Sequence, residues 1–212
     1  GKNVKYFLIA FISLFTFILT SKDYEKEIEE LRGAGYLIED YVDDTWVVRV
    51  QKYGDKNHNK EWEVHASVNG GEMMWGDALR VRIQLENIEQ CQKGNMFTHF
   101  YTYTDNENIK KLHNVRMAAK FREVDIIVLI LYPKKFLAGY RPIVDITHNK
   151  LDDLKGFLKG YNSVKLQLVD NEEVTVKDYF DRDYNTYSLK GFDDAIDRAR
   201  NECIRIVNDR NN

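Results

Sequence analysis

The sequence predicts an α+β fold: a mainly antiparallel β-sheet of about eight strands, arranged as a curved sheet or a sandwich, with N-terminal, middle and C-terminal helices. Two kinds of periodicity support this prediction. Several segments alternate apolar and polar residues with a period of two, which is typical of half-buried strands. Others repeat their apolar residues every three or four positions, which is typical of amphipathic helices.

Length and composition favour an ordinary globular protein. The chain has 212 residues, of which 43% are hydrophobic and 31% are charged, so it is long enough to bury a sizeable core. Its formal net charge of −3 provides no concentrated basic surface. We therefore expect no nucleic-acid partner.

An almost wholly apolar run over residues 6–19 follows Lys2 and Lys5 and ends just before Ser21. A short basic region, an apolar stretch and a small residue are typical of a secretory signal peptide. The same run could also serve as an uncleaved anchor with its lysines inside. We therefore predict that residues 1–21 are a signal peptide or an N-terminal membrane anchor, and that residues 22–212 form a single α+β domain.

In the first half of that domain, a short charged helix is predicted at Lys22–Arg32, ended by Gly33 and Gly35. Strands follow at Thr45–Val50, Glu61–Val68, Leu79–Glu86, Met96–Tyr103 and Val115–Phe121. Ile126–Leu131 is apolar throughout, which favours a central strand covered on both faces.

The second half mixes strands and helices. Strands are predicted at Pro142–Ile146, Val164–Leu168 and Val174–Val176. Asn149 or Thr147 is expected to cap a helix that runs to Lys159, with Gly160 as its stop.

A last helix is predicted from about Gly191 to Val207, with Asp197 and Arg200 on its polar side. Its apolar stripe consists of Ile196, Ala199, Cys203 and Ile206. Because only packing on the sheet can bury this stripe, we expect the helix to contribute strongly to stability.

Cys91 and Cys203 are the only two cysteines. In an oxidising compartment an even number of cysteines favours a disulfide, which would tie the last helix to the loop after Leu79–Glu86. The alternative is two separate buried thiols, since Cys203 lies on the apolar face of its helix. No CxxC pair indicates a redox site.

No pattern indicates a metal site or a cofactor. The histidines lack the HxH, HxxxH and HExxH spacings that zinc sites commonly use. We expect His65 on the solvent face of its strand and the others in loops. The five histidines are His58, His65, His99, His113 and His148.

Acidic residues before the last helix allow two further interpretations. Asp181, Asp183 and Asn185 begin like a calcium loop, but Thr186 and Phe192 stand where the motif needs glycine and glutamate, which favours a polar connection. A hydrolase would need carboxylates that converge in a cleft. The candidates for such a pair are Asp145, Asp178, Asp181 and Asp183.

An aromatic cluster precedes Val115–Phe121 and consists of Phe97, Phe100, Tyr101 and Tyr103. It could form a binding platform. Its near-alternating spacing favours a strand that fills the core and lines a neighbour.

The run from Tyr187 to Ala195, followed by Ala199 and Cys203, resembles the ending of invasion-associated locus B–like periplasmic proteins, where an SLxGF turn enters a helix. The resemblance covers about the last sixty residues. It implies an exported, β-rich protein without known catalysis. In this motif, Leu189 and Phe192 would dock the helix and Gly191 would let it approach the sheet, together with Ile196 and Ala199 of the stripe.

These observations predict an exported, non-enzymatic protein that acts by binding or within an envelope assembly. Its expected partner is another protein of the cell envelope, with membrane contact through residues 6–19 if that segment is retained. The alternatives are a membrane-anchored accessory subunit of a larger complex and the hydrolase described above. We expect no catalytic residues, no metal and no cofactor.

Overall fold

The computed structural model describes residues 37–42, 45–53, 61–72, 77–103, 107–136 and 138–210. The chain divides into two compact units, Gly1–Ile38 with Gln51–Glu61 and Glu39–Val50 with Trp62–Asn212. The second unit contains nearly all of the described residues. The predicted segment 1–21 and the predicted helix Lys22–Arg32 lie outside the described residues, as does His58.

The described residues form one sheet of ten strands, in the spatial order β1-β2-β3-β4-β5-β8-β7-β6-β9-β10. The strands are β1 Leu37–Val42, β2 Trp46–Tyr53, β3 Glu61–Asn69, β4 Ala78–Ile83, β5 Lys93–His99, β6 Val115–Phe121, β7 Val124–Phe136, β8 Gly139–Lys150, β9 Ser163–Val169 and β10 Tyr184–Ser188. From β3 to β10, neighbouring strands pair in antiparallel fashion. The predicted class, an antiparallel sheet with helices, is confirmed; the strand number is ten instead of about eight.

Alternation along the strands gives the sheet two different faces. In β4, Leu79, Val81 and Ile83 are buried in the core, whereas Arg80 and Arg82 point to the other side. We call that other side the second face. Because residues that pair across strands share a face, the register extends the second face from β3 to β7. Its cross-strand pairs are His65 with Arg82, Arg80 with Phe97, Phe97 with Asp145, and Asp145 with Leu129.

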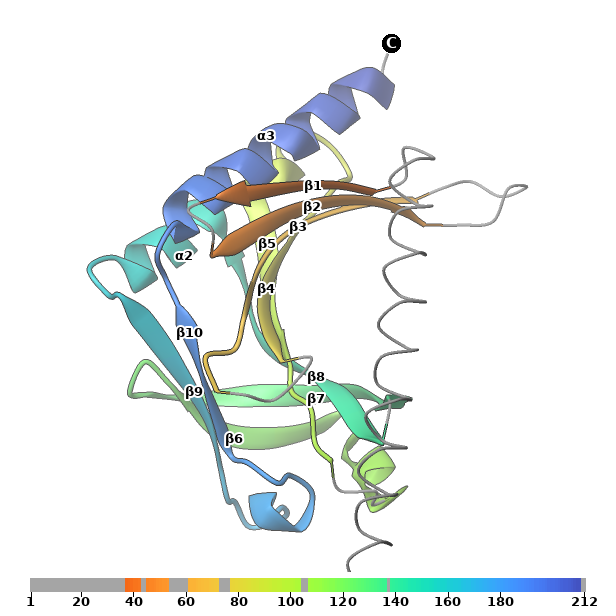
Figure 1. The fold of residues 1–212 in the computed structure, drawn as a ribbon, viewed down its shortest axis with the longest axis vertical. Helices are drawn as coiled ribbons and strands as arrows, with labels where there is room; N and C mark the ends of the chain where they lie inside the picture. The colour runs from red at the N-terminus through yellow and green to blue at the C-terminus, as the bar shows by residue number, and fades with distance from the viewer. Residues whose placement is uncertain are drawn as a thin grey trace, which may run out of the picture. The chain divides into compact units, whose positions relative to one another are not determined.

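Strands β4 and β5 bend strongly (Figure 1), and the connection after β3 reaches β10. Gly70 forms an antiparallel bridge with Tyr187, and the N–H of Gly71 donates to the carbonyl of Thr186 at 2.6 Å. A side chain at Gly70 would collide with the Asn185 side chain, so glycine permits this approach. These contacts occupy part of the outer edge of β10, which would otherwise offer unpaired backbone groups.

Two α-helices lie side by side next to the sheet: α2, Leu151–Leu158, and α3, Phe192–Arg210. Figure 1 shows α3 beside the strands β1 to β5. Short 3-10 helices are η1 Gln90–Gln92, η2 Glu107–Leu112 and η3 Val176–Asp178. The Nζ of Lys155 in α2 lies 2.9 Å from the carboxylate of Asp197 in α3, which ties the two helices together.

The start of α3 is anchored in the core. Leu189 and Phe192 are buried, and the Phe192 ring lies 5.1 Å from the Trp46 ring, centroid to centroid. Ile196 and Ala199 are fully buried in the same cluster. Gly191 has a φ of 78°, a left-handed conformation that favours glycine.

Cys91 and Cys203 form a disulfide with a Cα–Cα distance of 5.8 Å, so the predicted pair is present. Both residues are fully buried. The bond links η1 to α3 across 112 positions of sequence.

Several predicted elements differ from the observed ones. Val174–Val176 is no strand but leads into η3, because Asp170 and Asn171 accept hydrogen bonds from the backbone of this segment and fold it into a turn. Strand β5 ends at His99, short of the predicted Tyr103. Neither Asn149 nor Thr147 caps α2: β8 runs to Lys150, which occupies the N-cap position without a side-chain hydrogen bond.

The predicted strand Ile126–Leu131 forms the middle of β7, but it is wrong that both of its faces are covered. Val128 and Ile130 are buried, whereas the side chain of Ile127 on the second face is 69% exposed. An apolar run shows that a strand has no polar face; it does not show what lies against each face.

Candidate functional site

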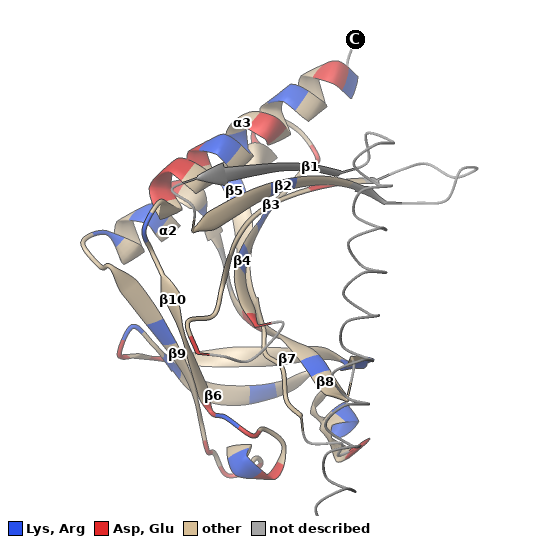
Figure 2. Cartoon of the chain, viewed as in Figure 1, with Lys and Arg blue, Asp and Glu red and all other residues tan. Residues whose placement is uncertain are grey.

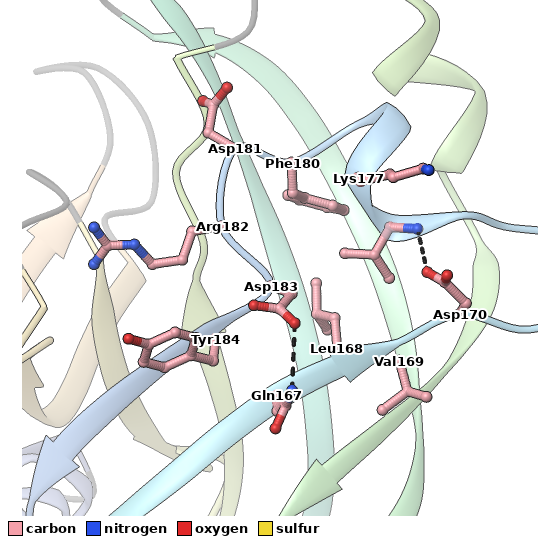
Figure 3. Close-up of a pocket in the computed structure, with 11 residues that line it drawn as sticks. Gln167, Leu168, Val169, Asp170, Lys177, Phe180, Asp181, Arg182, Asp183 and Tyr184 are labelled. Atoms are coloured by element: carbon pink, nitrogen blue, oxygen red, sulfur yellow. Dashed lines mark hydrogen bonds between the residues drawn. The ribbon is translucent and has the colours of Figure 1, made fainter.

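A cleft of about 590 Å³ lies where β9, η3 and β10 meet (Figure 3). Its lining contains the acidic residues Asp170, Asp181 and Asp183, together with Lys177 and Arg182. Two of the four carboxylates considered for a hydrolase, Asp181 and Asp183, line this cleft.

The carboxylates of this C-terminal cleft are bound within the protein. Asp170 accepts a hydrogen bond from the N–H of Val176 at 2.7 Å, and Asp183 accepts one from Gln167 Nε2 at 3.3 Å. Asp181 accepts hydrogen bonds from Thr102 Oγ1 and from the backbone N–H of Tyr103. These bonds fold the connection between β9 and β10 onto the sheet.

The four carboxylates considered for a hydrolase do not meet in this cleft. Asp181 and Asp183 point in different directions (Figure 3), while Asp145 lies on β8 and Asp178 in η3, outside the lining. The calcium-like start of the loop is also accounted for, because Asn185 is buried and its amide donates to Asp77.

A second cleft, of about 420 Å³, lies at the junction of β5, β7 and β8. We call it the basic cleft. Three of its seven lining residues are cationic and none is acidic; they are His99, Tyr132, Lys134, Lys135, Phe136, Arg141 and Ile143. The guanidinium of Arg141 lies 4.0 Å from the centroid of the Phe136 ring. Figure 2 shows that basic residues also occur along β4, the neighbour of β5.

The basic cleft forms where the β7–β8 ladder is irregular. The register shifts between Leu131 and Lys134, and Tyr132 has a φ of 46°, which is uncommon for a residue with a side chain. Its N–H donates to His113 Nδ1 at 3.2 Å. Proline at position 133 cannot donate to the ladder, so a bulge is the natural result. Such bulges and left-handed residues are common next to binding sites.

The prediction for His65 is wrong: its side chain is fully buried. Burial of the ring lowers the pKa of His65, and the charges of Arg80 and Arg49 act in the same direction, against a raising contribution from Glu63. The carboxylate of Glu63 lies 3.4 Å from His65 Nδ1. Period-two alternation separated His65 from the apolar face of β3 but could not show that the second face is also covered there.

His99 stands in β5 and lines the basic cleft, and His148 lies in β8, so neither is in a predicted loop; His113 lies in a turn. Burial and the nearby charges of Arg80 and Arg141 lower the pKa of His99 to about 3. His99 is therefore neutral at physiological pH. Among the residues that line the basic cleft, Lys134, Lys135 and Arg141 carry the positive charge.

The aromatic cluster is mainly buried, but only Phe100 belongs to the hydrophobic core. Phe97, Phe100 and Tyr101 are buried, whereas Tyr103 is exposed. The ring centroids of Phe100 and Phe180 lie 5.6 Å apart in an edge-to-face contact, as expected for core packing. The cluster therefore forms no continuous exposed platform.

The sequence contains one signal for the basic cleft, the segment Tyr132-Pro133-Lys134-Lys135 directly after an apolar strand. A proline inside a strand pattern indicates an edge or a bulge, and adjacent lysines mark it as polar. Arg141 belongs to the next strand, and only the register of the hairpin brings it opposite Lys134. The cluster was therefore not apparent from spacing.

Across the described part of the chain, no group of three or more His, Cys, Asp and Glu residues is placed to hold a metal ion. None of the helices in the described ranges combines the length and apolar character that crossing a membrane requires. Comparisons of the chain with known protein families, with curated proteins and with solved structures find no match.

Proposed function

We propose that this protein is an exported binding protein that acts without catalysis, and that the basic cleft receives the anionic group of its ligand or envelope partner. The observation that carries the proposal is the lining of the cleft, with three cations and no carboxylate. Arginine and lysine bind carboxylates and phosphates through charge-assisted hydrogen bonds. The stacking of Arg141 on Phe136 restricts the guanidinium and so lowers the entropic cost of holding an anion.

The chemistry of the lining favours binding over catalysis. None of its seven residues is a serine, threonine or cysteine that could act as a nucleophile beside His99. The low pKa of His99, caused by burial and by neighbouring arginines, also makes it a weak general base. As a neutral imidazole, it can instead donate a hydrogen bond to a bound anion.

The disulfide between Cys91 and Cys203 is compatible with an extracytoplasmic location, where disulfides persist. This agrees with the export predicted from residues 1–21 and with the resemblance of the C-terminal segment to periplasmic proteins. An envelope partner would present the anionic group as an acidic side chain or a bound phosphate.

The binding proposal is tested with the double variant Lys134→Glu/Lys135→Glu, which replaces two of the three cations. Isothermal titration calorimetry with citrate and with inorganic phosphate at low ionic strength should show binding to the wild-type chain. In the double variant, the affinity should fall at least about tenfold, since two charge-assisted contacts are lost.

The matched control is Lys159→Glu/Lys190→Glu, which makes the same change in net charge at two exposed positions away from the cleft. It should bind both anions as the wild type does. Equal losses in the two double variants would mean that only net charge matters, and absence of binding by the wild type would contradict the proposed function.

A further inference from the structure

We infer that the basic cleft binds an amphipathic anion: its carboxylate or phosphate head lies among the cations, and its apolar chain lies along the second face of β7. The inference rests on the proposed function of the cleft. It adds the chemical class of the ligand and the surface that receives its apolar part.

An apolar strip leads to the basic cleft along β7. It consists of Ile127, Leu129 and Leu131, which alternate with the buried Val128 and Ile130 and so lie on the second face. Ile127 is 69% exposed, and Leu129 and Leu131 are partly exposed. These side chains do not pack in the core, because Val128 and Ile130 of the same strand point into it instead.

The strip and the cleft are continuous. Leu131 pairs with Ile143, which itself lines the cleft, and Lys134 pairs with Arg141, two residues before Ile143 in β8. Tyr132, which is 57% exposed, stands at the junction. From Ile127 to Lys134 the strand covers about 23 Å, at about 3.3 Å per residue, which is the scale of an extended acyl chain.

Charge gives the ligand one orientation on this surface. The cations Lys134, Lys135 and Arg141 lie together at one end of the strip, whereas charges of opposite sign flank its middle, where Leu129 pairs with Asp145 of β8 and with Arg116 of β6. An anionic head is therefore attracted more strongly to the cleft than to the strip. An uncharged chain is accepted along the strip, where it covers exposed apolar surface.

The test compares three kinds of probe by calorimetry on the intact chain, below the micelle concentration of each amphiphile. Dodecanoate and dodecyl phosphate carry both parts, acetate and inorganic phosphate carry only the head, and dodecyl maltoside carries only the chain. We expect the two-part probes to bind at least tenfold more tightly than either one-part probe.

The variant Ile127→Thr keeps a β-branched residue but removes apolar surface from the strip. It should weaken the binding of dodecanoate several-fold and leave the binding of inorganic phosphate unchanged. Its control is Val124→Thr, a similar exchange of a β-branched apolar residue for threonine, at an exposed position of β7 on the face opposite the strip. The control should bind every probe as the wild type does.

The outcomes separate this inference from the proposed function. Equal affinity for dodecyl phosphate and inorganic phosphate overturns the inference and leaves the anion-binding function standing, whereas no binding of any anion overturns both. Binding to phosphatidylglycerol vesicles without binding to the monomeric amphiphiles also overturns it, in favour of a membrane surface. If the wild type sediments as a dimer and Ile127→Thr as a monomer, a second copy of the chain covers the strip, and the inference is overturned.

Discussion

Asp77 is a buried carboxylate that ties the β3–β4 connection to two other parts of the chain. It is 2% exposed and accepts hydrogen bonds from the N–H of Tyr101 at 2.5 Å and from Asn185 Nδ2 at 2.8 Å. Burial raises the pKa of Asp77 to about 6, although both hydrogen bonds and the charge of Arg182 act in the opposite direction. At neutral pH the protein therefore holds a carboxylate whose ionisation costs stability.

The expected effect has the opposite sign to that of an ion-paired carboxylate. The ordinary pKa of the group is 3.8, so the folded protein binds the proton more tightly than the unfolded chain does. The contribution of Asp77 to stability is present below about pH 4 and is lost as the pH rises through about 6, by an amount on the order of 2–3 kcal/mol.

Asp77→Asn should lack this pH dependence. Urea unfolding at pH 4 and pH 7.5 should show the variant gaining on the wild type by that amount at the higher pH. The control is Asp153→Asn, at an exposed position in α2. It should change the free energy of unfolding by the same amount at both pH values. If the free energy of unfolding of the wild type and of Asp77→Asn changed equally between the two pH values, the assigned pKa would be contradicted.

His65 and Lys134 show what single residues reveal in a sequence. Alternation assigned His65 to the face of β3 opposite the apolar residues, and the register confirms that it shares a face with Arg82. Its full burial depends on what lies over that face, a tertiary fact that no local pattern contains. Lys134 likewise joins a cluster only because the bulge in β7 brings Arg141 opposite it.

At the scale of elements, α3 is the helix whose packing can be tested most directly. Ile196 is fully buried, so Ile196→Ala should lower the free energy of unfolding by about 2–4 kcal/mol through lost burial and a residual cavity. Asn201 is exposed on the same helix, and Asn201→Ala should change it by less than about 0.5 kcal/mol. Denaturant unfolding measures both; equal small losses would mean that α3 contributes little to the core.

The structure gives Arg200 a larger role than its helical position predicts. Periodicity places it on the polar side of α3, yet its side chain is 19% exposed and bonds to Asp152 of α2 at 2.7 Å. The bond also lowers the pKa of Asp152. A helical wheel shows which residues avoid the sheet, but it cannot show that a second helix lies against the polar side.

The elements that the sequence predicted well are those with local and unambiguous periods. In β9, Val164, Leu166 and Leu168 are buried as their alternation indicates. The segment Val174–Val176 is wholly β-branched and so also favours a strand, but the side-chain oxygens of Asp170 and Asn171 accept hydrogen bonds from its backbone and fold it into a turn. Side-chain capping of that kind competes with strand formation and is hard to weigh from composition.

At the scale of the whole molecule, the disulfide joins two residues that are 112 positions apart in the sequence. Closing a loop across 112 positions restricts the unfolded chain, which corresponds to about 4–5 kcal/mol of stability by chain entropy. We expect the reduced protein, or the variant Cys91→Ala/Cys203→Ala, to unfold at a clearly lower denaturant concentration.

The same bond tests the proposed location. Protein isolated from its native source should have an intact mass two hydrogens below that of the reduced chain. A native protein with two free thiols would contradict export to an oxidising compartment, whereas unchanged stability on reduction would contradict the estimate of 4–5 kcal/mol above.

The contacts that β2 and the β3–β4 connection make with β10 also have a consequence for biosynthesis. The indole of Trp46 donates a hydrogen bond to the carbonyl of Ser188, 142 positions later. The N–H of Gly71 likewise donates to the carbonyl of Thr186, which is made much later in synthesis. At about 5–20 residues per second, a ribosome needs roughly 7–28 s to make the intervening chain. During that time the early strands lack both their last partners and α3, so their apolar face is open to other molecules. A nascent chain built in this order depends on protection until its final residues emerge.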